Sequence, residues 1–191
     1  MSNWVWHLPT SMTKLALIAL AAGSLCTFAC TDEGADDGGP EPLIAEMQIG
    51  VSIDGSEGFV LIADGADALL ASGSQGGFHV WTAPRFRGAM GTLYLDRRAR
   101  RVADGVLILR ASRLVFDLPA DAMDSWWRDE EAIPSFMCPP PVGITIFDAP
   151  IEFTFELLSE DGELIASDTL IVTPRCAAGA AGDFCRSTCA G

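Results

Sequence analysis

The chain has 191 residues, of which 49% are hydrophobic, and 26 acidic residues against 12 Lys and Arg give a formal net charge of −14. So negative a chain argues against nucleic acid as a partner, because that affinity comes from neutralising phosphates. The length after an N-terminal leader corresponds to one domain.

An uncharged apolar run spans residues 15–29 and follows Lys14. A short apolar segment behind a positive charge is the form of a secretory signal peptide. The run is shorter than the roughly 20 residues that a membrane-spanning helix needs. We therefore expect residues 1–29 to be a cleaved signal peptide, which leaves 11 Arg against 26 acidic residues and a formal charge of −15.

The signal ends in Thr27-Phe28-Ala29-Cys30. This sequence resembles the lipobox of bacterial lipoproteins, in which a cysteine is lipidated and becomes the mature N-terminus. The resemblance implies a lipid anchor at Cys30 and the membrane as a partner. An ordinary secreted protein and a retained N-terminal helix are the alternatives.

The stretch "TDEGADDGGPEP" that follows Cys30 has no large apolar residue and no positive charge. It cannot bury enough surface to offset its ordering entropy, so residues 30–42 are expected to be a disordered tether for a domain over 43–191. By resemblance to enterobacterial sorting signals, Thr31 favours the outer membrane. The domain is expected to face the periplasm or the cell surface.

Beyond residue 42, short apolar runs are separated by Gly, Asp and Pro. In "IEFTFELL" at 151–158, large apolar residues alternate with Glu and Thr, which is typical of a half-buried strand. Regular short strands of this kind predict an all-β fold, a single β-sandwich. We expect the other strands at 44–53, 59–63, 68–72, 78–88, 92–96, 106–111, 113–118, 143–148 and 164–174.

One segment, residues 118–141, interrupts this pattern and has prolines at both ends. The four-residue spacing of Met123 and Trp127 favours a short helix that starts near Asp121, a good N-cap residue. We expect a helical insertion packed across one end of the sandwich. The adjacent Trp126 and Trp127 are candidates for an aromatic contact with sugar or protein; packing at the end of the sandwich is the alternative.

The C-terminal part of the chain carries two resemblances. "IFDAPIEFTFELLSEDGELIASDTLIVTP" at 146–174 resembles the closing hairpin of immunoglobulin-like domains, with Asp161-Gly162 as a turn signal. The whole chain resembles lipoproteins of high-GC Gram-negative bacteria that have a "QGGFHVW"-type strand and a cysteine-bearing tail. These resemblances imply an anchored immunoglobulin-like β-sandwich and no particular activity.

Four cysteines remain beyond Cys30, an even number that predicts two disulfides in an oxidising compartment. Three pairings are open, and each of them joins Cys138 to the C-terminal tail. A zinc site is the alternative, although C-x8-C-x3-C lacks paired C-x2-C motifs. No metal or cofactor is predicted. The disulfide cysteines are Cys138, Cys176, Cys185 and Cys189.

His79 is the only histidine after residue 29, so a multi-histidine metal site is excluded and any Ser-His-Asp machinery must use it. "SGSQG" at 72–76 resembles a nucleophile motif in part. Ser74 lies only five residues from His79, however, and no strand-to-helix elbow follows. We expect His79 to be a structural residue bonded to backbone, beside Trp81 on one strand face.

"RRARR" at 97–101 is a basic island in an acidic chain, and Arg110 and Arg113 lie close to it in sequence. Arginines on two neighbouring strands could hold phosphate or carboxylate groups bidentately. Pairing with the chain's own Asp and Glu residues is the alternative. The candidate anion-binding residues are Arg97, Arg98, Arg100 and Arg101.

These observations predict an outer-membrane lipoprotein that acts as a binding or structural module, with a protein or polysaccharide partner. A carboxylate-based hydrolase or another extracytoplasmic enzyme is the alternative. Such an enzyme needs two Asp or Glu side chains that converge in a cleft with pKa values pushed apart.

Overall fold

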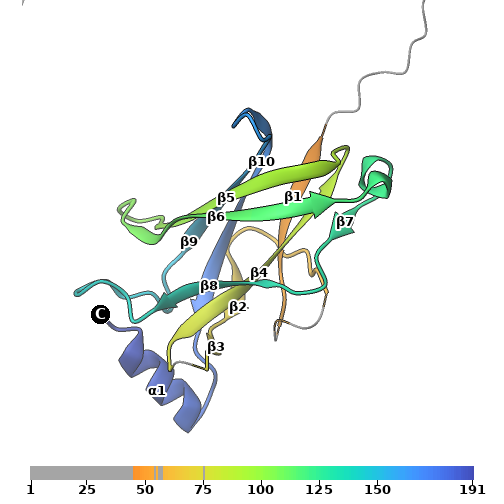
Figure 1. Ribbon diagram of the computed structural model, residues 1–191. Coiled ribbons are helices and arrows are strands. Elements are labelled where there is room, and N and C mark those ends of the chain that lie inside the picture. Colours follow the sequence, from red (N-terminus) through yellow and green to blue (C-terminus); the bar gives the residue numbers. More distant parts are fainter. Residues whose placement is uncertain (1–44, 54, 56–57, 75) are drawn as a thin grey trace, which may run out of the picture. The chain divides into compact units, whose positions relative to one another are not determined.

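The computed structural model describes residues 45–53, 55, 58–74 and 76–191. The predictions for the signal peptide, for Cys30 and for the tether at 30–42 lie outside these residues. Within the described ranges the fold is all-β: two sheets form a sandwich, as predicted (Figure 1). No helix in those ranges has the length and apolar character needed to cross a membrane.

The first sheet is organised around one central strand, β4 (Phe78–Arg87). Thr82 of β4 pairs with one strand on each side, which places the sheet's other strands along both edges of β4. All pairs in this sheet are antiparallel. One edge of β4 carries β1 (Glu46–Val51) and β3 (Ala71–Ser72), and the other carries β7 (Trp127–Arg128) and β8 (Ile133–Cys138).

The second sheet has the strand order β2-β10-β9-β5-β6. The β2–β10 pair is parallel and the other pairs are antiparallel. Its strands are β2 (Ala66–Leu69), β5 (Gly91–Arg101), β6 (Leu107–Leu118), β9 (Ile151–Leu158) and β10 (Leu164–Arg175).

The core lies between the two sheets, and β9 shows how the sequence forms it. Ile151, Phe153, Phe155 and Leu157 are all fully buried, while the residues between them are only partly buried. This confirms the predicted alternation. Each such side chain contributes about 1.5–3 kcal/mol of hydrophobic free energy. Phe86 of the first sheet belongs to the same cluster.

Two of the expected strands are wrong. Within 59–63 only Val60 pairs, in an isolated bridge to Val51, and 143–148 forms turns. Both runs are apolar, but each ends at a turn of the chain. The first turn lies at Ala63-Asp64-Gly65, and the second lies at Asp148, which has a positive φ. These turns stop the runs from pairing as longer strands.

Other strands have different boundaries from those expected. The runs 106–111 and 113–118 form the single strand β6, because Ser112 between them pairs with Arg97. The run 68–72 is divided between β2 and β3, which belong to different sheets, and the buried Leu70 separates them.

The predicted short helix near Asp121 is present, but the rest of the insertion differs from what was expected. Its helix is one 3₁₀ turn, η1 (Ala120–Met123), with Pro119 at the N-cap and Asp121 in the first turn. The rest of the segment does not cross one end of the sandwich, because it supplies β7 and β8 to the first sheet. Pro134, which has no N–H to donate, fits in β8 because this strand pairs only with β4.

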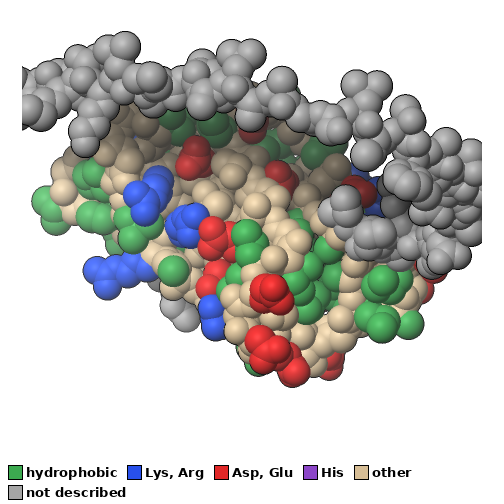
Figure 2. All heavy atoms as spheres, turned by 90° about the horizontal axis from the view of Figure 1, so that it is seen from above, with side chains coloured by type: hydrophobic (Ala, Val, Ile, Leu, Met, Phe, Trp, Pro, Cys, Tyr) green, Lys and Arg blue, Asp and Glu red, His purple; other side chains and the backbone are tan. Residues whose placement is uncertain are grey.

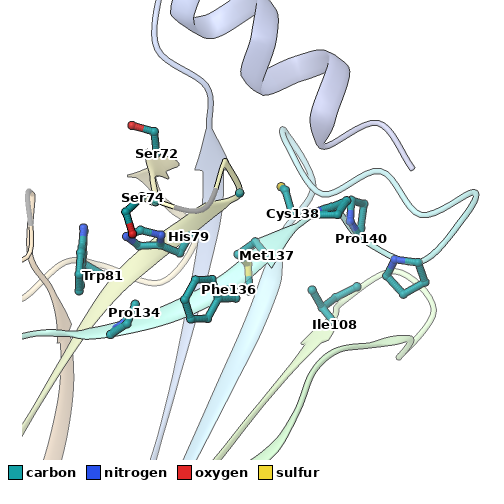
Figure 3. Close-up of a pocket in the computed structure, with 14 residues that line it drawn as sticks. Ser72, Ser74, His79, Trp81, Ile108, Pro134, Phe136, Met137, Cys138 and Pro140 are labelled. Atoms are coloured by element: carbon teal, nitrogen blue, oxygen red, sulfur yellow. The ribbon is translucent and has the colours of Figure 1, made fainter.

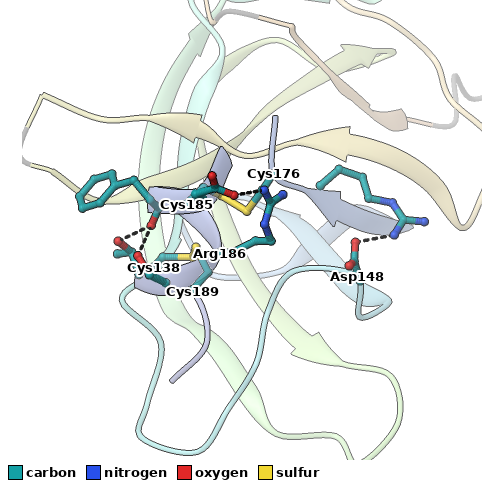
Figure 4. Close-up of a disulfide and its surroundings, with 11 residues drawn as sticks. Cys138, Asp148, Cys176, Cys185, Arg186 and Cys189 are labelled. Carbon is teal, nitrogen blue, oxygen red and sulfur yellow. Dashed lines mark hydrogen bonds and ion pairs between the residues drawn. A yellow bond between two sulfur atoms is a disulfide. The ribbon is translucent and has the colours of Figure 1, made fainter. Parts of the chain in front are cut away.

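The C-terminal tail ends in a helix that was not expected, α1 (Ala180–Thr188). Two disulfides hold it, Cys138–Cys189 with Cα atoms 5.1 Å apart and Cys176–Cys185 at 5.7 Å (Figure 4). The predictions of two disulfides and of a link from Cys138 to the tail are therefore confirmed. Asp183 and Arg186 form an ion pair one turn apart on the helix.

Candidate functional site

A pocket of about 670 Å³ lies where β3, β4 and β8 meet, next to the proline run that follows β8 (Figure 3). Its polar side chains come from β3, the β3–β4 turn and β4, and its apolar side chains come mainly from β8 and the prolines. Residues that carry these groups include Ser72, Ser74, His79, Trp81, Ile108, Pro134, Phe136, Met137 and Pro139–Pro141.

His79 is the most unusual group of this pocket. Its side chain is 3% exposed and stands edge-on to Trp81, with ring centroids 4.4 Å apart, and 5.6 Å from the ring of Phe136. Neither ring nitrogen has a hydrogen-bond partner among the described residues. The expected neighbour Trp81 is confirmed, but the expected bond to backbone is wrong. A buried polar group left unpaired costs about 1–3 kcal/mol.

The pocket is uncharged near neutral pH. Burial lowers the pKa of His79, so the imidazole is neutral, with one nitrogen as donor and the other as acceptor. The described lining residues include no Asp, Glu, Lys or Arg, and Cys138 is held in a disulfide. The polar side-chain groups of the described lining are therefore the imidazole, the hydroxyls of Ser72 and Ser74 and the indole N–H of Trp81.

Glycines allow the β3–β4 turn to lie against the imidazole. Gly73 N–H donates to the carbonyl of Gly77 at 2.7 Å and closes the turn. A Cβ at Gly73 would lie 3.3 Å from His79 Nδ1, and one at Gly77 would lie 2.6 Å from the carbonyl oxygen of Cys138. The second distance is too short for any side chain, so Gly77 is required where this turn meets β8.

Ser74 and His79 both line the pocket, although they are only five residues apart in sequence (Figure 3). Nucleophilic catalysis would require a hydrogen bond from the serine to the imidazole and a carboxylate that orients the ring. Within the described part of the chain, His79 has neither partner. The arrangement therefore supports binding rather than acyl transfer.

The opposite wall of the pocket is stiff. Cys138 continues into three consecutive prolines, whose rings fix the φ angle at each step. Cys138 is also joined to Cys189 at the end of α1. Two covalent constraints thus hold this wall before any ligand arrives, which lowers the entropy cost of binding.

The four candidate anion-binding arginines do not share one surface. Arg97 points into the sandwich, is 8% exposed and donates to Ser112 and Ser135 hydroxyls and to the Pro134 carbonyl. Burial lowers the pKa of Arg97 to about 10. Its guanidinium is thus occupied inside the fold and unavailable to a surface ligand.

The other three arginines lie toward solvent. Arg98 makes two hydrogen bonds to Glu156, and Arg101 pairs with Asp104, so these two follow the self-pairing alternative. Arg100 is exposed. Figure 2 shows basic and acidic side chains interspersed on one face of the molecule.

The two neighbouring tryptophans have different surroundings. Trp127 stacks on Phe86, with centroids 6.2 Å apart, and packs edge-on to Phe116 in the core. The ring of Trp126 lies 4.4 Å from the Arg85 guanidinium, in a smaller hollow of about 300 Å³. Of the two candidates for an aromatic contact, Trp126 thus lines a hollow of the surface, whereas Trp127 packs against core phenylalanines.

The sulfurs of Cys176, Cys185 and Cys189 lie within 4.8 Å of one another, which resembles a metal-binding cluster. All three are engaged in disulfides, however, and a disulfide sulfur is not the thiolate that zinc requires. The cluster is therefore a pair of adjacent cross-links.

No protein-family model matches the chain, and no curated protein matches its sequence. Function is therefore inferred from the N-terminal sequence features and from the chemistry of the His79 pocket.

Proposed function

We propose that this chain is a lipid-anchored extracytoplasmic module with an immunoglobulin-like β-sandwich, and that it binds a ligand in the His79 pocket. The carrying observation is the imidazole of His79, buried in an uncharged pocket with both nitrogens unpartnered by described residues. Buried polar groups in native proteins normally have partners. A concave, mostly apolar site with a few convergent polar groups is also the usual form of a ligand site.

The strand order supports the immunoglobulin-like part of this proposal. In sequence and pairing, β10-β9-β5-β6 correspond to the strands G-F-C-C′ of a variable-type domain. Strands β1, β4 and β8 correspond to A, B and E of the opposite sheet.

The sequence supports the anchored, extracytoplasmic location. The apolar run ends at Cys30, and an acidic tether follows it. Two disulfides in the sandwich fit an oxidising compartment, since disulfides are rare in the cytosol. We place the domain on the outer membrane, facing the periplasm or the cell surface.

The carboxylate hydrolase is the less favoured alternative. The described lining of the His79 pocket contains no Asp or Glu. Hydrogen bonds from arginines lower the pKa of Asp96, through Arg113, and of Asp104, through Arg101. A carboxylic general acid needs the opposite change, a raised pKa.

Ligand screening with a blocked pocket tests the binding part. Ser74→Trp places a large side chain at the pocket mouth, and Val115→Trp places the same side chain on β6, where Val115 is 62% exposed. Compounds from a diverse library that raise the Tm of the full chain should do so in Val115→Trp but not in Ser74→Trp. The proposal is rejected if no compound stabilises the wild type, or if stabilisation is unchanged in Ser74→Trp.

A further inference from the structure

The pocket discriminates against ions. Its described lining residues carry no charge, so an ionic ligand would lose hydration without gaining a counter-charge. The formal charge of −14 on the whole chain further disfavours an anion. The ligand that fits best is therefore a neutral molecule.

An aromatic platform stands at the side of the pocket. Phe136 pairs with His79 across β4 and β8, so both side chains project from the same face of the sheet. The Phe136 side chain is 56% exposed, unlike the phenylalanines of the core. Trp81 and Pro134, which also pair with each other, extend the apolar surface. A ligand with one apolar face would cover this surface.

The polar groups beside this aromatic surface favour a ligand whose own groups can both donate and accept hydrogen bonds. Neutral His79 has one donor and one acceptor nitrogen, and the hydroxyls of Ser72 and Ser74 each do both. Both imidazole nitrogens are buried in this conformation. A ligand that pairs with them therefore requires side chains of the pocket lining to move, and Ser72 and Ser74 of that lining are exposed. An alkyl chain would leave all of these groups unpaired.

From these three features, and resting on the proposed function, we infer that the pocket binds a neutral sugar ring of a glycan. The C–H face of the sugar packs on Phe136 and Trp81. Its hydroxyls, each a donor and an acceptor, pair with His79, Ser72 and Ser74. The volume of about 670 Å³ falls within the range of ligand sites and leaves room for about one or two rings.

The test uses the full chain with free neutral sugars as probes: glucose, galactose, mannose, N-acetylglucosamine and their short oligomers. Binding is followed by titration and by ¹⁵N NMR of the imidazole nitrogens, with His79→Gln to assign their signals. At least one sugar should bind and shift the His79 signals. Phe136→Ala should weaken that binding by about tenfold or more, as expected for an aromatic anchor.

Phe184→Ala is the matched control, because Phe184 is 58% exposed and lies outside the pocket lining. Its affinity for the sugar should equal that of the wild type. Glucuronic acid, an alkyl alcohol and a short peptide serve as competing probes. If one of these binds in the pocket and no sugar does, the sugar inference is overturned while the proposed binding function stands. If neither sugars nor the wider library bind, both are overturned.

Discussion

Arg97 of β5 donates a hydrogen bond from Nη1 to Ser135 Oγ of β8 at 3.2 Å, and so connects the two sheets through the interior. The same nitrogen donates to the Pro134 carbonyl, and Nε donates to Ser112 Oγ at 2.8 Å. Ser135 in turn lies 3.1 Å from Thr82 Oγ1. A basic island in the sequence thus supplies a buried polar link of the sandwich.

Arg97→Ala should lower the free energy of unfolding by about 3 kcal/mol, because it leaves a cavity and removes three hydrogen bonds from a buried network. Arg98→Ala is the control, since its partly exposed pair with Glu156 should contribute about 1 kcal/mol or less. Urea unfolding measures both. Equal losses in the two variants would show that the buried link has no special role.

The lowered pKa of His79 predicts a stability that falls on acidification. The unfolded chain takes up a proton as the pH drops through 6.5, whereas the folded imidazole resists protonation until a lower pH. The unfolded state therefore binds more protons in that window, and the folded state loses stability there. The Tm of the wild type should fall between about pH 7 and about pH 5, within the range where histidine titrates.

His79→Gln should remove most of this acid dependence, because none of the described residues lining the pocket has another ionisable side chain. Val115→Gln introduces the same residue at an exposed position outside the pocket lining, and this control should retain the acid dependence. Thermal unfolding followed by circular dichroism checks the three chains. A wild-type slope that survives in His79→Gln would assign the acid sensitivity to other groups.

The two disulfides should differ in their contribution to stability. Cys138–Cys189 spans 51 residues and Cys176–Cys185 spans 9. The chain-entropy model gives about 4 and about 3 kcal/mol for loops of these lengths. Replacing both cysteines of a pair by Ser should therefore lower the free energy of unfolding more for Cys138–Cys189 than for Cys176–Cys185. Urea unfolding of the two double variants measures this difference.

Peptide mapping of the oxidised protein should recover these two cross-linked pairs and no free thiol among the four cysteines. Recovery of a different pairing, or of a stoichiometric zinc ion, would contradict the disulfide assignment.

Lipidation at Cys30 is expected from the apolar run that ends at Ala29 and the tether that follows. Metabolic labelling with a tagged fatty acid should mark the protein, and Cys30→Ser should abolish the label. Cys26→Ser removes a cysteine four residues earlier and should leave the label intact. Label that persists in Cys30→Ser would remove the lipid anchor from the proposal.

Local sequence patterns gave the best predictions for strands in which one face is apolar and the other is polar. The strand β9 was predicted to the residue, because Ile151 to Leu157 alternate with Glu and Thr, and only one register buries them. The strand β8 was missed because it contains Pro134 and is followed directly by Pro139, and prolines argue against a strand. Only the pairing, which leaves β8 on an edge, makes Pro134 acceptable.

The helix α1 was also missed, since the tail has small residues and one large apolar side chain, Phe184. A usable signal was present: Cys185 and Cys189 are four residues apart, which places both on one face of a helix. The pocket could not be predicted, because it depends on which residues of β4 and β8 face each other. That His79 lies opposite Phe136 follows from pairing between distant segments.

The disulfide of Cys138 also affects the order in which the protein reaches its final structure. It forms part of the pocket wall, and its covalent partner Cys189 comes 51 residues later in the chain. This wall can therefore be cross-linked only after α1 has been synthesised and the two cysteines have been oxidised. In a reduced chain, this wall would lack its covalent link to the residue that follows α1. If the pocket binds a ligand as proposed, its affinity should therefore depend on oxidation of this cysteine pair.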